Sequence, residues 1–158
     1  MPTKKDYEKL SDLENLQKQW RKLSGLQSQP RREWSAAIVR AATAAEIAAN
    51  YAIRQELISK RKLETEFVDN LLHWANGLRG KLEHLLVPLT SKEAGKATKM
   101  KKLKGLANEI NSQRNSIVHQ GEFCNEDEAK RAIEKTREFI VDLVRLYEPG
   151  FEIDIKRK

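Results

Sequence analysis

Residues 34–54 read WSAAIVRAATAAEIAANYAIR, a run in which small apolar side chains occupy most positions. Apolar residues recur along it every three or four positions, which predicts a helix from just after Pro30 to about Lys60. Further alanines cover most of its other sides, so this helix is apolar nearly all round. Such a helix belongs at the centre of a bundle, where its small side chains let neighbouring helices pack closely against it.

One line of polar side chains interrupts this apolar surface. Its members are spaced three, three, four and four positions apart, and they are Arg40, Thr43, Glu46, Asn50 and Arg54. That spacing places them on a single face of the helix. We expect the line to face either water or a polar site.

Four more stretches with helical periodicity flank this central pattern, over about residues 6–23, 62–87, 99–119 and 125–147. Charged residues make up 34% of the chain and there are only 7 glycines and 4 prolines, which favours long amphipathic helices over many short strands. A chain of 158 residues fits one domain. We therefore predict an all-α fold, an up-and-down bundle of four to five helices.

Three regions are expected along the chain: an N-terminal helical arm (1–30), the helical bundle (31–148) and a basic C-terminal tail (149–158). The stretch 151–155 alternates like a short strand but is too short to form a sheet alone. It is expected to pair with a partner chain or to remain a tail. We interpret the 62–87 pattern as an ordinary core helix, and Trp20, Trp34 and Trp74 as packing residues rather than platforms for nucleobases.

The excess of basic residues points to an acidic partner, and nucleic acid is the commonest such partner. The formal net charge is +7, and the stretch Ser91–Lys104 holds six lysines against the single Glu93. Residues 91–102 are expected to be a mobile connection. The candidate nucleic-acid-binding residues are Lys99, Lys101, Lys102, Lys104, Arg40 and Arg54. A solvated loop is the alternative interpretation of the lysine-rich stretch.

The single cysteine, Cys124, rules out an internal disulfide, and the sequence has neither a CxxC pair nor a His/Cys cluster for zinc. The longest apolar stretch, 36–53, is broken by Arg40, Glu46 and Asn50, and no apolar leader is visible. We therefore expect a cytoplasmic protein that binds no membrane, and no metal or cofactor is predicted.

The string Arg114-Asn-Ser-Ile-Val-His119 sets a cation, an amide and a titratable imidazole close together. Asn115 and His119 are four positions apart and so share a helix face, where the amide can fix the tautomer of the imidazole. Arg114 lies at the edge of the apolar stripe, where a guanidinium is costly unless it meets a carboxylate or a phosphate. Glu46 is the internal candidate for that carboxylate. These groups are the parts of a metal-free phosphodiester cleavage site.

The pattern Arg114-Asn-x-x-x-His119-x-Gly121, after an alanine-rich helix that carries Glu46, resembles the HEPN superfamily over about residues 31–147. The resemblance implies a compact bundle of four to five helices that forms a homodimer and places both copies of the motif in one cleft. Many members of that family are metal-independent endoribonucleases of toxin, antiviral or RNA-processing systems, and others are non-catalytic binding modules. By this resemblance Arg114, Asn115 and His119 occupy the motif positions, and Glu46 loosely matches an acidic residue of the earlier helix.

The resemblance also implies RNA as the partner and suggests how it would be cut. His119 would take the proton of a ribose 2′-hydroxyl or give one to the leaving 5′-oxygen, and the second His119 of a homodimer would do the other. Arg114 would hold the phosphate oxygens as charge builds on them. The products would carry a 2′,3′-cyclic phosphate. A separate antitoxin or regulatory protein is a further candidate partner.

Structural interpretations of the same residues remain open. His119 can cap the last carbonyls of its helix, and Arg114 can be no more than the ion-pair partner of Glu46. The polar line can be a solvated strip. Two other functions are compatible with the sequence: a non-catalytic module that binds a nucleotide, a nucleic acid or a protein, and a plain structural or assembly protein.

Overall fold

The computed structural model describes residues 4–27, 34–75, 77–120 and 125–153, without the side chains of residues 4–11, 26, 27, 119 and 120. All regular elements in these residues are helical, which confirms the all-α prediction. They are α1 (Lys4–Gln27), α2 (Trp34–Arg54), η1 (Gln55–Lys60), α3 (Thr65–Trp74), α4 (Leu78–Gly80), η2 (Lys81–Leu86), α5 (Val87–Leu89), α6 (Ala94–Gln120) and α7 (Glu126–Arg145). η1 and η2 are wider π-helical turns, and the backbone at Arg54 and Gly80 stays helical, so each continues the helix before it.

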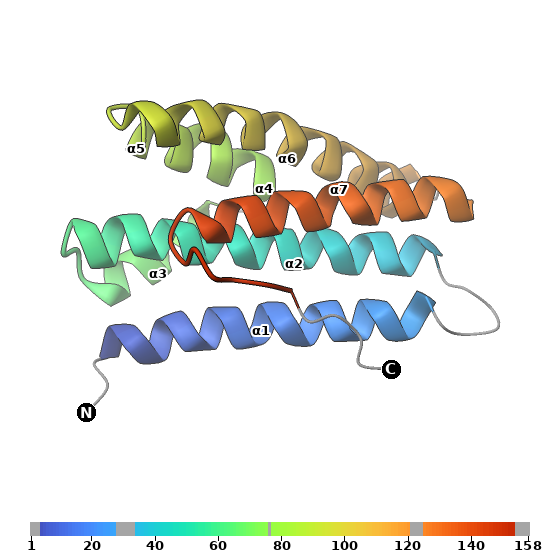
Figure 1. The fold of residues 1–158 in the computed structure, drawn as a ribbon, viewed down its shortest axis with the longest axis horizontal. Helices are drawn as coiled ribbons and strands as arrows, with labels where there is room; N and C mark the ends of the chain where they lie inside the picture. The colour runs from blue at the N-terminus through green and yellow to red at the C-terminus, as the bar shows by residue number, and fades with distance from the viewer. Residues whose placement is uncertain (1–3, 28–33, 76, 121–124, 154–158) are drawn as a thin grey trace.

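The long helices form an up-and-down bundle with α2 at its centre. Figure 1 shows α1 and α6 running in one direction and α2 and α7 in the other. α2 packs against α1, α6 and α7. Its buried alanines are Ala37, Ala41, Ala42, Ala44, Ala45, Ala48, Ala49 and Ala52. The central position predicted for residues 34–54 is therefore confirmed.

The N-terminal helix shares the core of the bundle. Leu16, Trp20 and Leu23 of α1 are buried and belong to the same apolar cluster as the alanines of α2. α1 continues through Ser24 and Gly25 to Gln27, past the end that the apolar pattern gives. The hydroxyl of Ser24 donates to the carbonyl of Trp20, at 3.2 Å, within the helix.

The segment after α7 folds back between α7 and α1 (Figure 1). Phe151 and Ile153 are buried and Glu152 is exposed, so the alternation of this segment reflects docking of every second side chain into the core. The Nε of Arg145 donates to the carbonyl of Phe151, at 2.9 Å, and the amide of Gln17 on α1 donates to the carbonyl of Glu152, at 3.1 Å. No strand pairing is involved in residues 151–153, and residues 154–158 lie outside the description.

The prediction of a single helix over 62–87 is wrong, because α3 ends at Trp74 and a new helix starts at Leu78. Gly77 has φ 90° and ψ 143°, a conformation open to glycine but strained for other residues. The buried side of α3 is formed by Val68 and Leu72. Trp74, at the end of α3, is 83% exposed, so its assignment as a packing residue is also wrong, whereas Trp20 is buried as expected.

The prediction of a mobile connection over 91–102 is also wrong. A short turn at 90–93 leads into α6, which begins at Ala94. The amine of Lys96 lies 3.1 Å from Oε2 of Glu56, a carboxylate with 0% exposure. This ion pair ties the first turn of α6 to the core.

Candidate functional site

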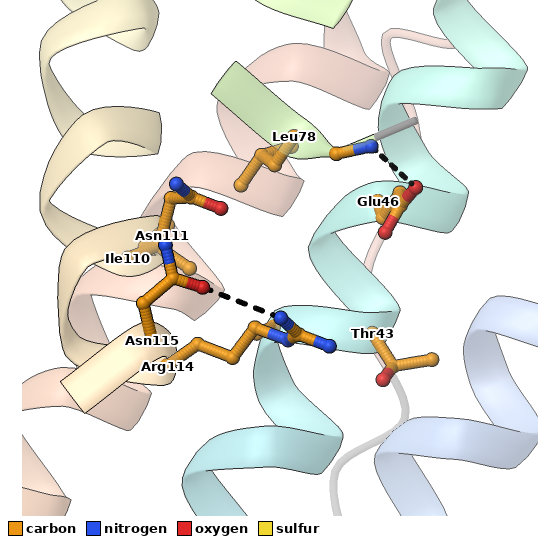
Figure 2. Close-up of a pocket in the computed structure, with 9 residues that line it drawn as sticks. Thr43, Glu46, Leu78, Ile110, Asn111, Arg114 and Asn115 are labelled. Atoms are coloured by element: carbon orange, nitrogen blue, oxygen red, sulfur yellow. Dashed lines mark hydrogen bonds between the residues drawn. The ribbon is translucent and has the colours of Figure 1, made fainter. Parts of the chain in front are cut away.

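A pocket of about 420 Å³ lies between α2 and α6, beside the break that separates α3 from α4. It is lined by Ala42, Thr43 and Glu46 of α2, by Gly77 and Leu78, and by Ile110, Asn111, Arg114 and Asn115 of α6. Three of the four predicted catalytic residues, Glu46, Arg114 and Asn115, therefore meet in one pocket (Figure 2). Its volume lies in the range usual for ligand sites.

The sequences of the two helices explain why the pocket exists. α2 places the small side chains Ala42 and Thr43 opposite α6, so the helices meet without filling the space between them. On α6, Arg114 and Asn115 follow Asn111 by three and four positions, so both lie beside it on the helix surface. The buried lining residues are apolar, and the polar ones are partly or fully exposed. Such a division is typical of sites that bind small polar molecules.

Glu46 binds Lys81 and not Arg114. The Nζ of Lys81 lies 2.7 Å from Oε1 of Glu46, and the backbone N–H of Gly77 donates to the same oxygen at 3.4 Å. The side chain of Lys81 is only 3% exposed, so its ammonium requires a nearby anion, whereas Arg114 remains partly exposed to water. The predicted pairing of Arg114 with Glu46 is therefore wrong.

Arg114 has no carboxylate partner among the described residues. Its Nη1 donates to Oδ1 of the neighbouring Asn115, at 3.3 Å. Figure 2 shows the guanidinium extending from α6 toward Thr43 on α2. A guanidinium has five N–H donors, so most of its hydrogen-bonding capacity remains for an anion that enters the pocket.

His119 belongs to α6, one helical turn beyond Asn115, but its side chain and Gly121 lie outside the described residues. The hydrogen bond expected between the Asn115 amide and the imidazole therefore stays a prediction. The Oδ1 of Asn115 accepts from Arg114, which leaves the N–H groups of the amide for that bond.

The six candidate nucleic-acid-binding residues do not gather on one surface. Lys99 and Lys102 line a second pocket, of about 290 Å³, beside Asp142 and Arg145, and Lys101 is exposed. Lys102 lies 3.6 Å from Glu138, and Lys104 lies 3.8 Å from Glu83. All four lysines are on α6.

Arg40 and Arg54 instead bind α1, which lies on the other side of α2 from α6 (Figure 1). Arg40 donates to Gln19 at 3.0 Å, and Arg54 contacts Oδ2 of Asp12 at 2.7 Å and Asp69 at 3.3 Å. Burial alone would lower the pKa of Arg54, but the charges of Asp12 and Asp69 and the hydrogen bonds to them together outweigh burial and raise that pKa. The polar line on α2 therefore divides between the interface with α1 and the pocket, to which Thr43 and Glu46 belong.

Sequence reasoning missed Lys81 and Asn111. Asn111 stands three and four positions before Arg114 and Asn115, so its place on their face was available from the spacing. Lys81 had no such signal. Its approach to Glu46 depends on the break at Gly77, which redirects the following helix.

A second group of titratable side chains surrounds the buried carboxylate of Glu56, and we call it the Glu56 cluster. It consists of Glu56, Lys60, Arg61, Lys96 and Tyr147. Arg61 lies 3.0 Å from one carboxylate oxygen, and the hydroxyl of Tyr147 donates to the other at 2.7 Å. Burial alone would raise the pKa of Glu56, but hydrogen bonds from Tyr147, Lys96 and Arg61 leave it below its ordinary value. Burial, followed by the bond to Glu56, raises the pKa of Tyr147.

Two further features concern metals and membranes. No group of three or more His, Cys, Asp or Glu side chains in the described part of the chain is arranged to hold a metal ion. None of the described helices is both long and apolar enough to cross a membrane. When the chain is compared with known proteins, no family model, no curated protein and no solved structure matches it.

Proposed function

We propose that the protein is a metal-independent endoribonuclease of the toxin, antiviral-defence or RNA-processing type, which cuts RNA in a cleft between two copies of the chain. The observation that carries the proposal is the pocket, in which the Arg114 guanidinium has no carboxylate partner among the described residues and lies beside Asn111 and Asn115. A phosphate diester supplies the anion that this guanidinium lacks. The resemblance of the Arg114–His119 string to the HEPN superfamily supports the same assignment.

The proposed reaction needs one base and one acid. A 2′-hydroxyl loses its proton to His119 of one copy, and the 2′-oxygen forms a bond to phosphorus. The bond from phosphorus to the 5′-oxygen breaks, and that oxygen takes a proton from His119 of the other copy. The products are a 2′,3′-cyclic phosphate and a free 5′-hydroxyl. Arg114 stabilises the charge on the non-bridging oxygens, and Asn115 holds its guanidinium in place.

Glu46 receives a positioning role in this scheme. Its Oε1 accepts from Lys81 and from the backbone of Gly77, so the carboxylate is held away from Arg114 and does not neutralise it. Lys81 thereby keeps the guanidinium available for the substrate.

A non-catalytic module that binds a nucleotide or RNA is the second candidate. The described pocket offers a cation and two amides for binding, while its carboxylate is already engaged by Lys81. Binding thus requires only groups that the pocket holds, whereas cleavage also requires the imidazole of His119.

Incubation of the protein with single-stranded RNA in excess EDTA tests the proposal. Wild type is expected to release cyclic phosphate ends, and Arg114→Ala and His119→Ala to lower the rate by at least about 100-fold, in line with the loss of a charge-stabilising or acid-base group. Arg131→Ala, an exposed arginine on α7, is the matched control and should keep the wild-type rate.

Two other results would redirect the assignment. RNA binding that depends on Arg114, without cleavage at any pH from 5.5 to 8, would favour the non-catalytic module. Cleavage that survives in His119→Ala would contradict the mechanism.

A further inference from the structure

Trp74 is the most exposed large apolar side chain in the described part of the molecule. It is the last residue of α3, and 83% of its surface is accessible. Val68 and Leu72 provide the buried side of α3, so the core does not use the indole ring. The imidazole of His73 contacts it edge to face, with ring centroids 6.4 Å apart and planes at 82°. The flat face of an indole is therefore presented to solvent.

Trp74 is close in the chain to the Arg114 pocket. Gly77, which lines the pocket, follows Trp74 by three residues, and three residues span at most about 11 Å. The backbone between them is held at both ends: the N–H of Ala75 donates to Leu71 at 2.8 Å, and the N–H of Gly77 donates to Glu46 at 3.4 Å. The Cα atoms of Trp74 and of Gly77, a residue that lines the pocket, therefore lie within about 11 Å of each other.

Phe67 provides an internal comparison on the same helix. It is 58% exposed and stands seven residues before Trp74, two helical turns or about 10 Å away along the helix. Exposed carboxylates and exposed cations both lie near Phe67 in the sequence, Glu64 and Glu66 as well as Arg61 and Lys62, so charge does not separate the two ends of α3. Phe67 differs from Trp74 in that no residue that lines the pocket follows it closely in the sequence.

We propose that Trp74 and the Arg114 pocket form a two-part site for an unpaired nucleotide, in which the base stacks on Trp74 and the phosphate binds Arg114. This inference rests on the proposed function and names single-stranded RNA as its substrate class. Aromatic platforms beside basic grooves are the usual means of holding single strands, because each base offers a flat face. In a duplex those faces are covered by the neighbouring base pairs, so a double strand cannot use the indole.

Binding of a 2′-O-methyl oligonucleotide tests the inference, because that oligonucleotide lacks the nucleophile and cannot be cut. Fluorescence anisotropy would compare a labelled single strand with its duplex. Trp74→Ala is expected to weaken single-strand binding by about 5- to 150-fold, the usual effect of removing a stacking platform. Trp74→Phe keeps an aromatic face and should lose less than about fivefold. Phe67→Ala, the matched control, should bind like wild type.

The outcomes separate this inference from the function on which it rests. Loss of binding in Arg114→Ala but not in Trp74→Ala would overturn the stacking role and keep the phosphate site. Equal binding of single strand and duplex would also overturn it. Weaker self-association of both Trp74→Ala and Phe67→Ala in sedimentation would assign the α3 surface to a second copy of the chain and overturn the stacking role. If wild type bound neither oligonucleotide, the stacking role and RNA as the ligand would both be wrong.

Discussion

Glu46 and Lys81 share one ion pair, but they differ greatly in exposure. The side chain of Lys81 is 3% exposed and that of Glu46 is 37% exposed. If Lys81 is removed, the carboxylate can still be hydrated. If Glu46 is removed, the buried ammonium of Lys81 is left without an anion, and this costs more free energy of folding than removal of Lys81.

We therefore expect Glu46→Ala to destabilise the protein far more than Lys81→Met. Glu46→Ala should lower the free energy of unfolding by about 3 kcal/mol, whereas Lys81→Met, which keeps an apolar stem of similar volume, should cost about 1 kcal/mol or less. Urea denaturation at pH 7 measures both values. The double variant should be more stable than Glu46→Ala alone, and equal losses for the two single variants would contradict the asymmetry.

At the scale of elements, the break between α3 and α4 determines the shape of the pocket. It places Gly77 and Leu78 in the lining, brings Lys81 to Glu46 and leaves Trp74 in solvent. Within this break Gly77 has a positive φ, and a Cβ at Gly77 would meet no atom within 4 Å. The cost of replacing Gly77 therefore comes from the backbone and not from a clash.

Gly77→Ala is expected to lower the free energy of unfolding by about 1 to 3 kcal/mol, because alanine is strained at φ 90°. Gly105→Ala is the matched control, since Gly105 lies within α6 and a Cβ there also meets nothing within 4 Å. That change should stabilise the protein by about 0.5 to 1 kcal/mol. Thermal unfolding followed by circular dichroism measures both, and a stabilising Gly77→Ala would show that the break does not need glycine.

The same break marks how far the fold could be predicted from the sequence. Periodicity identified the central helix at 34–54, because its signal is local and repeats over five turns. Periodicity failed at 62–87, because the apolar spacing continues across the point where the helix is interrupted. The apolar positions of this line are Leu63, Phe67, Leu71, Trp74 and Leu78. The pattern treated Trp74 as a core residue for that reason. Whether a residue on an apolar line is buried depends on which other elements pack against it, and the spacing of residues along one helix does not give that information.

The candidate site was predictable in part for a related reason. Arg114 and Asn115 follow from a local string, and the polar line on α2 pointed to Glu46. The pairing of Glu46 was mispredicted because Lys81 is 35 residues away and reaches it only after the break. Arg40 and Arg54 looked like members of a basic surface, but α1 supplies Gln19 and Asp12 to them.

At the scale of the whole molecule, the Glu56 cluster connects segments that are far apart in the sequence. Arg61 lies five residues from Glu56, Lys96 lies 40 residues away, and Tyr147 lies 91 residues away. η1, the first turn of α6 and the turn that follows α7 thus meet at a single carboxylate. The pKa of Glu56 is lower in the folded protein than its ordinary value of 4.5. The stabilisation from its charge is therefore fully present above that value and is lost as the pH falls toward the folded pKa.

Glu56→Gln is expected to lower the free energy of unfolding by about 3 kcal/mol at pH 7, because Lys96 and Arg61 lose their shared anion. The difference from wild type should narrow below about pH 4.5, where the wild-type carboxyl begins to take up a proton. Urea denaturation between pH 7 and pH 3 measures this difference. Glu109→Gln removes an exposed ion pair with Lys135 and should cost less than about 1 kcal/mol. A difference that stayed constant with pH would contradict the electrostatic account.

The contact between α1 and the segment 151–153 has a consequence for how the protein is made. Gln17 and Glu152 are 135 residues apart, and Phe151 and Ile153 help to cover the core to which α1 contributes. At about 5 to 20 residues per second, a ribosome needs roughly 7 to 27 s to add the second partner after the first. During that interval the nascent chain carries an amphipathic helix whose apolar side is incompletely covered. The core can be fully covered only after Phe151 and Ile153 have left the exit tunnel, and until then α1 is a natural substrate for chaperones.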